Sequence, residues 1–343
     1  MLERHEYFYD KPFEFEDGGH LDSMTITYYT SAREYKKGDR VVWVCHALTG
    51  NANPEDWWPQ MVGPGKMFDP DECFVVCAAM ICSAYGSCGP FNVNPATHRP
   101  WLLDFPRTSV RDMVRSHIIV REHLGIDSID VLLGPSIGGF QAVEWAVMEP
   151  DVIKTAIFLA TDTRVAPMVT AYNESQRMAL KADPTFLAAE SLEGGREGLK
   201  CARSIALISY RTMDGYNLTQ SEKDDDTLFA DRAGSYQRHQ GDKLVARGFD
   251  AYSYWYLTYA LDSHNVGRGR GGEASALSGI KARTLVCNIN TDVLFPSNRA
   301  IKSAACIPGA VYRDLPSIFG HDGFLIENDA LTAIFKDFFS CQE

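Results

Sequence analysis

The sequence predicts an α/β protein with a mostly parallel sheet, helices on both faces and a helical insertion. Apolar runs of strand length alternate with helix-length segments in the first 160 residues and again near the C-terminus. Between these parts, residues 161–272 contain helix-like segments but no strand-like run. We therefore predict a core formed by 1–160 and 273–343, with 161–272 as a helical lid insertion.

Composition narrows the possible classes of protein. The 343 residues are 45% hydrophobic and 23% charged, which is typical of a globular chain, and the net charge of −12 disfavours nucleic acid and anionic membranes as partners. No run reaches the roughly 18 apolar residues of a membrane span, and the N-terminus lacks the apolar core of a signal peptide. We therefore expect a cytoplasmic protein.

The nine cysteines are scattered, and several lie in strand-like runs, as expected of free thiols in a reducing compartment. Four of them cluster in the sequence, at Cys73, Cys77, Cys82 and Cys88. Their spacing does not match the C-x2-C pairs of structural zinc sites, so we expect no metal.

The strands are expected where β-branched and aromatic residues gather. Residues 1–20 should lie along a sheet edge. The predicted strands are 24–29, 41–45, 74–79, a strand from 131 leading into a glycine-rich turn, 154–160, 283–289 and 310–315.

Helices are expected where apolar residues recur at helical spacing. The core helices are 108–124, ended by Gly125, one that follows the glycine-rich turn and stops near Pro150, and a final helix from about 324. The insertion helices are 166–181, 196–210 and 251–261, the last with Asp250 as its N-cap. The aromatic run from Tyr252 to Tyr259 fits either packing inside the insertion or a contact between two subunits.

One short motif predicts a catalytic nucleophile. The stretch Gly134-Pro135-Ser136-Ile137-Gly138 lies between an apolar run and a helix-like segment, as in a G-x-S-x-G nucleophile elbow. The glycines allow a sharp turn that exposes the serine hydroxyl at a helix N-terminus. Ser136 is therefore the candidate nucleophile, and the alternative is a glycine-rich helix start without chemistry.

A serine nucleophile needs a base, and the base needs an orienting acid. In the α/β-hydrolase fold these follow in the order Ser, Asp or Glu, His, in loops after late strands. Asp292 follows the strand 283–289, and His321 lies after the last strand. We predict Asp292 and His321 as acid and base; Asp314 is the alternative acid, and a structural role is the alternative for His321.

Two backbone N–H groups form the oxyanion hole of this fold. One belongs to Ile137, directly after the nucleophile. The other is predicted at Leu48, in the turn 46–50 after an early strand, where His46 is expected to be structural.

The chain resembles the homoserine O-acetyltransferase family of the α/β-hydrolase superfamily. The resemblance runs nearly end to end through the following stretches: His46-Ala47-Leu48-Thr49-Gly50, Trp57-Trp58, Gly63-Pro64-Gly65-Lys66, Asp104-Phe105-Pro106, Arg111-Asp112-Met113-Val114, Glu144-Trp145-Ala146, Tyr210-Arg211, Gln240-Gly241-Asp242-Lys243 and Gly320-His321-Asp322. It implies a ping-pong transfer of acetyl from acetyl-CoA to the hydroxyl of L-homoserine, a reaction of methionine biosynthesis, in a homodimer built through the insertion. No permanently bound cofactor is implied.

The resemblance also assigns roles to residues. Ser136, Asp292 and His321 match the family's nucleophile, acid and base. Arg203 matches the arginine that holds the amino-acid carboxylate, Tyr210 a tyrosine lining the same pocket, and Asp322 the aspartate that meets the ammonium. This agrees with chemistry, because a zwitterion needs one cation and one anion.

The chain departs from the family pattern at the elbow, where Pro135 and Ile137 replace a glycine and a methionine, and in the loop 81–84 before Tyr85. The alternatives are therefore a succinyl-CoA-dependent or serine-accepting transferase, a hydrolase of small esters, and a non-catalytic binding protein on the same fold.

Overall fold

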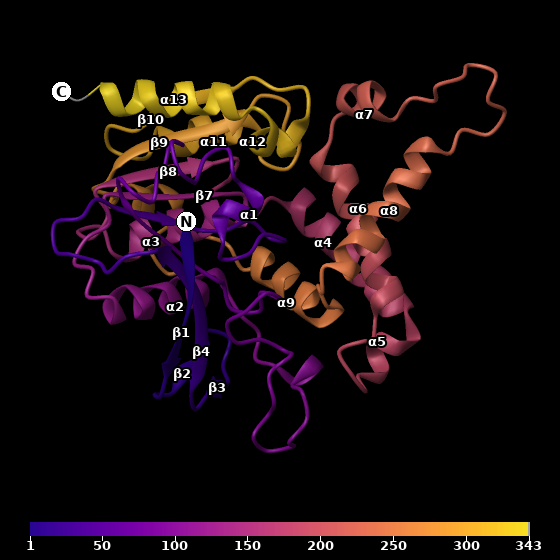
Figure 1. Cartoon of the computed structure of the whole chain (residues 1–343), viewed down its shortest axis with the longest axis horizontal. Helices are drawn as coiled ribbons and strands as arrows, with labels where there is room; N and C mark the ends of the chain where they lie inside the picture. The colour runs from indigo at the N-terminus through magenta and orange to yellow at the C-terminus, as the bar shows by residue number, and fades with distance from the viewer. Residues whose placement is uncertain (342–343) are drawn as a thin grey trace.

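The computed structural model describes residues 1–341, and its centre is one mixed sheet (Figure 1). Within these residues the sheet has eight strands in the order β1-β4-β6-β5-β7-β8-β9-β10. β1 pairs antiparallel with β4, and β4 with β6; all later pairs are parallel. The strands are β1 Leu2–Tyr9, β4 Met24–Ser31, β5 Val41–Val44, β6 Phe74–Ala78, β7 Val131–Pro135, β8 Thr155–Leu159, β9 Arg283–Ile289 and β10 Val311–Leu315.

This topology confirms the predicted fold class, and β1 lies at the sheet edge as expected for the N-terminal residues. A small second sheet joins β2 (Phe13–Glu14) and β3 (His20–Leu21). The helices of the core are α1 Pro54–Trp57, α2 Val110–His123, α3 Ile137–Met148, α11 Ser297–Ala304, α12 Gly323–Ile326 and α13 Asn328–Ser340, with short 3-10 turns η1 Leu102–Asp104 and η2 Gly320–Asp322.

The strands alternate their side chains between two cores. On β5, Trp43 packs on the face covered by α2 and α3, while Val42 and Val44 pack on the face covered by α13. All three side chains are fully buried. A strand buried on both faces is a continuous apolar run, which is why 41–45 predicts a central strand.

Helix α2 shows why its predicted range was nearly right. Ser109 is its N-cap and accepts from the N–H of Asp112, whose carboxylate accepts in return from the N–H of Ser109. Gly125, with a positive φ of 66°, directly follows the C-cap residue Leu124, as expected of a residue at this position.

Helices α4 to α8 stand to one side of the sheet, and α9 lies between them and the core (Figure 1). They leave after β8 and return before β9, in the segment predicted as the insertion. Their bounds are α4 Pro167–Ala182, α5 Pro184–Ala188, α6 Arg196–Tyr210, α7 Met213–Gln220, α8 Arg232–Ala246 and α9 Ala251–Asp262. The short helix α10, Glu273–Leu277, follows them and lies in the segment predicted as core. None of the helices in residues 1–341 has both the length and the apolarity to cross a membrane.

The aromatic run on α9 packs inside the protein. Tyr252, Tyr254 and Tyr256 are at most 2% exposed. The Tyr252 ring stacks on Phe186 at 5.0 Å, and the Tyr254 hydroxyl donates to Gln176 of α4 at 2.5 Å. Tyr252 and Tyr254 therefore join insertion helices to one another, while the Tyr256 hydroxyl donates to the carbonyl of Leu103 in the core at 2.7 Å, so none of the three is free for a contact between subunits.

Candidate active site

Ser136 lies on a strained turn between β7 and α3. Its φ of 61° and ψ of −124° are unusual for a residue with a side chain. The neighbours must be small, because a Cβ on Gly138 would lie 2.1 Å from the carbonyl oxygen of Cys45, and one on Gly134 would lie 2.4 Å from that of Gly138. The turn thus brings α3 against β5 and β7 with Ser136 at the helix N-terminus.

His321 and Asp292 come together from two loops at the ends of neighbouring strands. His321 Nδ1 lies 2.7 Å from Asp292 Oδ2. Asp292 Oδ1 accepts from the N–H groups of Leu294 and Phe295 at 2.8 and 3.2 Å, so the carboxylate is fixed in place. The alternative acid, Asp314, lies on β10 and instead accepts from the hydroxyls of Ser297 and Tyr312.

The environment of His321 suits a base. Burial lowers the pKa of His321, but the charges of Asp292 and Asp322 and the hydrogen bond to Asp292 outweigh it, and the net pKa is raised. With Nδ1–H donating to Asp292, the neutral ring leaves Nε2 free to accept a proton. The imidazole is 3% exposed and lies among the rings of Phe295, Phe324 and Tyr210 at 5.3–5.6 Å.

A small cavity opens in front of Ser136. Its volume is about 30 Å³, and it is lined by Leu48, Ser136, Val169, Tyr172, Asn173, Gln176, Ser209, Tyr210, Leu261, Leu294 and Phe295. Phe295 and Tyr210 line this cavity and also flank His321, so they connect the two sides of the site. Helix α4 contributes four of the lining residues, which the sequence did not predict, because no motif marks them.

The two predicted oxyanion groups are available. Within residues 1–341, no hydrogen-bond acceptor is found for the N–H of Leu48 or of Ile137. Ile137 is the first residue of α3, where a backbone N–H has no partner inside the helix. Leu48 lines the same cavity as Ser136, so its loop lies beside the candidate nucleophile.

Of the predicted substrate residues, Tyr210 lines the same cavity, and Asp322 directly follows His321 in the chain. The guanidinium of Arg203 lies 5.7 Å from the Tyr210 ring centre and has no acid partner among the described residues. Asp322 does have a partner: its Oδ2 accepts from Arg211 Nε at 2.5 Å. The sequence did not predict this role for Arg211. Arg211 therefore already neutralises part of the Asp322 charge.

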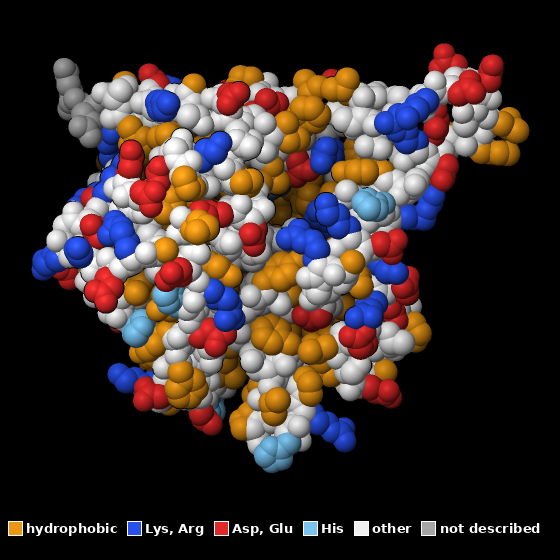
Figure 2. All heavy atoms as spheres, in the orientation of Figure 1, with side chains coloured by type: hydrophobic (Ala, Val, Ile, Leu, Met, Phe, Trp, Pro, Cys, Tyr) orange, Lys and Arg blue, Asp and Glu red, His pale blue; other side chains and the backbone are white. Residues whose placement is uncertain are grey.

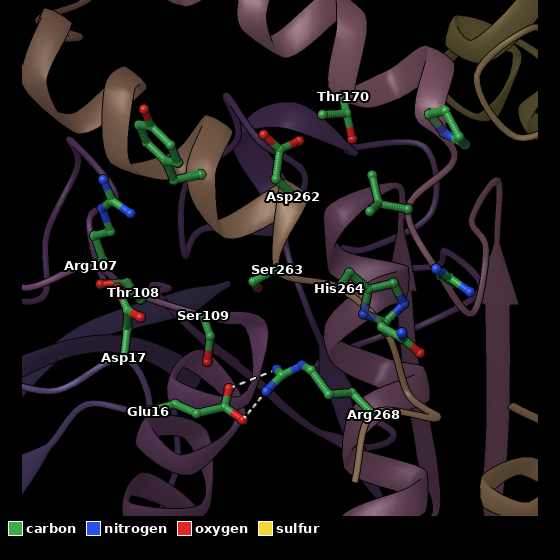
Figure 3. Close-up of a pocket in the computed structure, with 15 residues that line it drawn as sticks. Glu16, Asp17, Arg107, Thr108, Ser109, Thr170, Asp262, Ser263, His264 and Arg268 are labelled. Carbon is green, nitrogen blue, oxygen red and sulfur yellow. Dashed lines mark hydrogen bonds and ion pairs between the residues drawn. The ribbon is translucent and has the colours of Figure 1, made fainter. Parts of the chain in front are cut away.

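A much larger cavity lies elsewhere and does not include Ser136. Its volume is about 700 Å³, and Figure 3 shows Glu16 and Arg268 paired across its base, near Ser109 and His264. Arg268 donates two hydrogen bonds to Glu16, at 2.6 and 2.9 Å. On its other side, Asp262 is paired with Arg177 and Asn173. Glu16, Arg268 and Asp262 are thus already paired, whereas Arg107 and Arg164 have no acid partner within residues 1–341. Among these residues the cavity holds no hydrogen-bonded serine–histidine–acid set, so its size alone does not make it the reaction site.

Comparison with known proteins identifies the family. A family model described as the alpha/beta hydrolase fold matches residues 40–327. The homoserine O-acetyltransferase of Cyclobacterium marinum is 40% identical over 97% of this chain and 95% of its own. That of Chlorobaculum parvum is 38% identical over 95% and 92%. The crystal structure of the Bacillus anthracis homoserine O-acetyltransferase superposes with a TM-score of 0.89 at 21% identity, covering 98% of this chain and 97% of that one. The chain belongs to the homoserine O-acetyltransferase family, within the alpha/beta hydrolase fold.

Proposed function

We propose that this chain transfers an acetyl group from acetyl-CoA to the side-chain hydroxyl of L-homoserine, through an acyl-enzyme on Ser136. Membership of the family supports the reaction. The single structural observation that carries the proposal is the contact of His321 with Asp292 beside the cavity that holds Ser136.

In the first half-reaction, His321 Nε2 takes the proton of Ser136 while Oγ attacks the thioester carbonyl. The N–H groups of Leu48 and Ile137 hold the oxyanion. The C–S bond then breaks, and His321 returns the proton to the departing thiol of CoA. Asp292 stabilises the imidazolium throughout and keeps the ring in the required tautomer.

In the second half-reaction, the homoserine hydroxyl gives its proton to His321 and attacks the acyl carbon. The bond to Ser136 Oγ breaks, and His321 reprotonates the serine. Arg203 binds the substrate carboxylate, Tyr210 forms the wall, and Asp322, held by Arg211, meets the ammonium. The small volume of the cavity limits water, which favours transfer over hydrolysis.

The test is release of CoA thiol, followed colorimetrically, with acetyl-CoA or succinyl-CoA as donor and homoserine or serine as acceptor. Wild-type protein should release thiol fastest from acetyl-CoA with homoserine, and Ser136→Ala should lower that rate by at least about 10³-fold. Near-normal release by the variant would exclude the acyl-serine mechanism. Hydrolysis of small esters at a rate indifferent to homoserine would favour an esterase.

We also propose that the chain forms a homodimer through its insertion, as the family resemblance implies. Large apolar side chains on and after α7 are strongly exposed: Met213 at 77%, Leu218 at 68%, and Leu228 and Phe229 at 84% each. Such a group is unusual on a monomer surface. Light scattering in solution that gives the mass of a single chain would contradict this arrangement.

A further inference from the structure

Arg247, the residue that caps the C-terminal end of α8, contacts the loop that follows β6 in the core. Its guanidinium lies 5.7 Å from the ring centre of Tyr85, which belongs to the loop after β6. Tyr85 also makes an edge-to-face contact with Phe249, at 5.5 Å between ring centres. This contact joins the insertion to the core and has no part in the mechanism above.

Two arginine–tyrosine contacts form a line from this point toward the catalytic base. Arg247 lies over Tyr85, and Arg203 lies over Tyr210, which flanks His321 at 5.6 Å. Burial raises the pKa of the Tyr85 phenol, and the positive charges of Arg247 and Arg203 oppose this rise. Exposure changes along the line, from a buried His321 through a half-buried Arg203 to an exposed Arg247.

The cations on this line are unpaired. Within residues 1–341, Arg203, Arg247 and Lys243 have no carboxylate within salt-bridge distance, whereas neighbouring cations on α6 and α8 do: Lys200 pairs with Glu197 and Asp242, and Arg238 with Asp231. Lys243 is four residues before Arg247, so the two share one face of α8. Figure 2 shows a hollow between the sheet and the α6–α8 helices, with Lys and Arg side chains on its helix side.

We propose that Arg247, assisted by Lys243, binds the phosphate groups of the acyl-thioester donor at the hollow beside α8, while the thioester reaches Ser136. The inference rests on the proposed function and assigns the donor's anionic end to particular residues. Arg203, deeper on the line, is left for the acceptor carboxylate. Arginine suits phosphate because its planar donors bind two oxygens at once.

The geometry fits the chemistry of such a donor. Its pantetheine arm separates the thioester from the phosphates, so the phosphate site must lie near the surface and away from Ser136. Arg247 is exposed, while the cavity of Ser136 is too small for more than the reacting groups. The Tyr85 hydroxyl is buried without a hydrogen-bond partner in the described chain, and a ligand passing between the two arginines would supply one.

Two alternatives must be weighed: Arg247 could serve only to stabilise the end of its helix, and the donor phosphates could bind in the large cavity instead. Basic residues at the end of α8 would also stabilise the helix dipole, but the Arg247 guanidinium lies on a ring of the core rather than on the last carbonyls of its helix. In the large cavity, Arg107 also stacks on a tyrosine, Tyr259 at 4.9 Å, and has no acid partner within residues 1–341. That cavity is separated from Ser136 by the Asn173–Asp262–Arg177 contacts.

The experiment compares Arg247→Ala with Arg107→Ala and Arg238→Ala by steady-state kinetics. Arg247→Ala should raise KM for acetyl-CoA about tenfold, the usual size of one lost charged contact, and leave kcat and KM for homoserine within about twofold. The defect should disappear with S-acetylpantetheine, which lacks the nucleotide. Lys243→Ala should show a smaller effect of the same kind, and Arg238→Ala none.

The proposal is overturned if Arg107→Ala rather than Arg247→Ala raises KM for acetyl-CoA, or if Arg247→Ala changes only KM for homoserine. Calorimetric binding of CoA to Ser136→Ala, with and without Arg247→Ala, needs no turnover. CoA binding that does not depend on Arg247 contradicts the site even if transfer occurs. Absence of any CoA binding to the parent contradicts the proposed function instead. Melting curves and Arg247→Lys, which retains the charge, control for unfolding.

Discussion

His321 keeps a raised pKa although it is buried, and this ties the rate of the reaction to pH. Burial acts to lower the pKa, and the two neighbouring carboxylates, Asp292 and Asp322, outweigh it. A base must be neutral to accept the Ser136 proton. The rate should therefore rise with pH through the His321 pKa, with a midpoint above the ordinary histidine value of about 6.5.

Asp292→Asn should move that midpoint to lower pH, because one of the charges that favour the imidazolium is lost. The same change should lower kcat by roughly 10³–10⁴-fold, since the asparagine amide favours the wrong histidine tautomer. The check is the pH dependence of thiol release between pH 5 and 9 for both proteins. An unchanged midpoint would mean that a different group titrates. Asp314→Asn is the matched control, because Asp314 bonds to Ser297 and Tyr312 instead.

The sequence was sufficient to predict the candidate nucleophile, acid and base. The elbow motif predicts Ser136, and the order of acid and base along the chain predicts Asp292 and His321. The structure brings His321 onto Asp292 across 29 residues of sequence, and the catalytic roles of all three remain predictions. The pairing of Arg211 with Asp322, 111 residues apart, could not be predicted. Neither residue carries a local signal for its partner, because the contact exists only once the insertion lies on the core.

At the scale of elements, the elbow depends on how closely α3 approaches β5. Gly138→Ala should abolish transfer and lower the melting temperature, because its Cβ would overlap the Cys45 carbonyl at 2.1 Å and backbone cannot move aside cheaply. Gly279→Ala is the matched control: its nearest atom is 3.4 Å away and its φ is not positive, so stability should change little. The checks are thermal melts and thiol release.

If Gly138→Ala retained near-normal activity, the close approach of α3 to the sheet would not be needed to place Ser136. A loss of stability in Gly279→Ala equal to that in Gly138→Ala would instead indicate a general cost of removing glycine. The two variants separate these cases because they make the same chemical change at a crowded and at an open position.

Elements with strong periodicity or clear caps were predicted well. The ranges 196–210 and 283–289 match α6 and β9 residue for residue, and Asp250 caps α9 by accepting from the N–H of Ser253. Helix α8 was missed. It buries only Gly241 and Leu244, so its sequence lacks the apolar stripe that marks a helix. The helix is stabilised by packing against α6, and the local sequence of α8 gives no sign of that contact.

For the whole molecule, the fold class followed from alternating strand and helix signals, but the place of the reaction did not follow from the shape. The cavity of about 700 Å³ excludes Ser136, and the one that holds Ser136 measures about 30 Å³. Only the chemistry of named residues distinguishes the two. The division into a core and a lid insertion at 161–272 also stays a prediction, because it concerns how the helices work together in the reaction.

Three buried histidines join distant parts of the molecule in their neutral form. His46 accepts from the N–H of Met80, His117 contacts Gln141 of α3, and His264 contacts the carbonyl of Asp162. Burial lowers the pKa of each, to about 4 for His46 and His117 and to about 3 for His264. In the unfolded chain each would titrate near 6.5. Between these values the unfolded state binds more protons, so the folded state loses stability as pH falls.

The loss should begin near pH 6.5 and approach about 4 kcal/mol per pH unit below pH 5.5, at about 1.36 kcal/mol per histidine. This is large against a typical total stability of 5–15 kcal/mol, so we expect acid unfolding near pH 5. Glu16, with a pKa of about 2, contributes only below its ordinary value of 4.5. His321 acts in the opposite direction, since its raised pKa adds stability that is lost above pH 6.5.

Urea unfolding at several pH values between 5 and 8 measures this slope. In His117→Gln this slope should correspond to about one proton fewer taken up on unfolding, because glutamine does not titrate. The result should hold whatever the stability at pH 8, and the glutamine can still donate to Gln141. A variant slope equal to that of the wild type would show that His117 takes up its proton in the folded state. In that case only His46 and His264 would contribute, and the slope below pH 5.5 would approach about 2.7 kcal/mol per pH unit, at about 1.36 kcal/mol for each of the two.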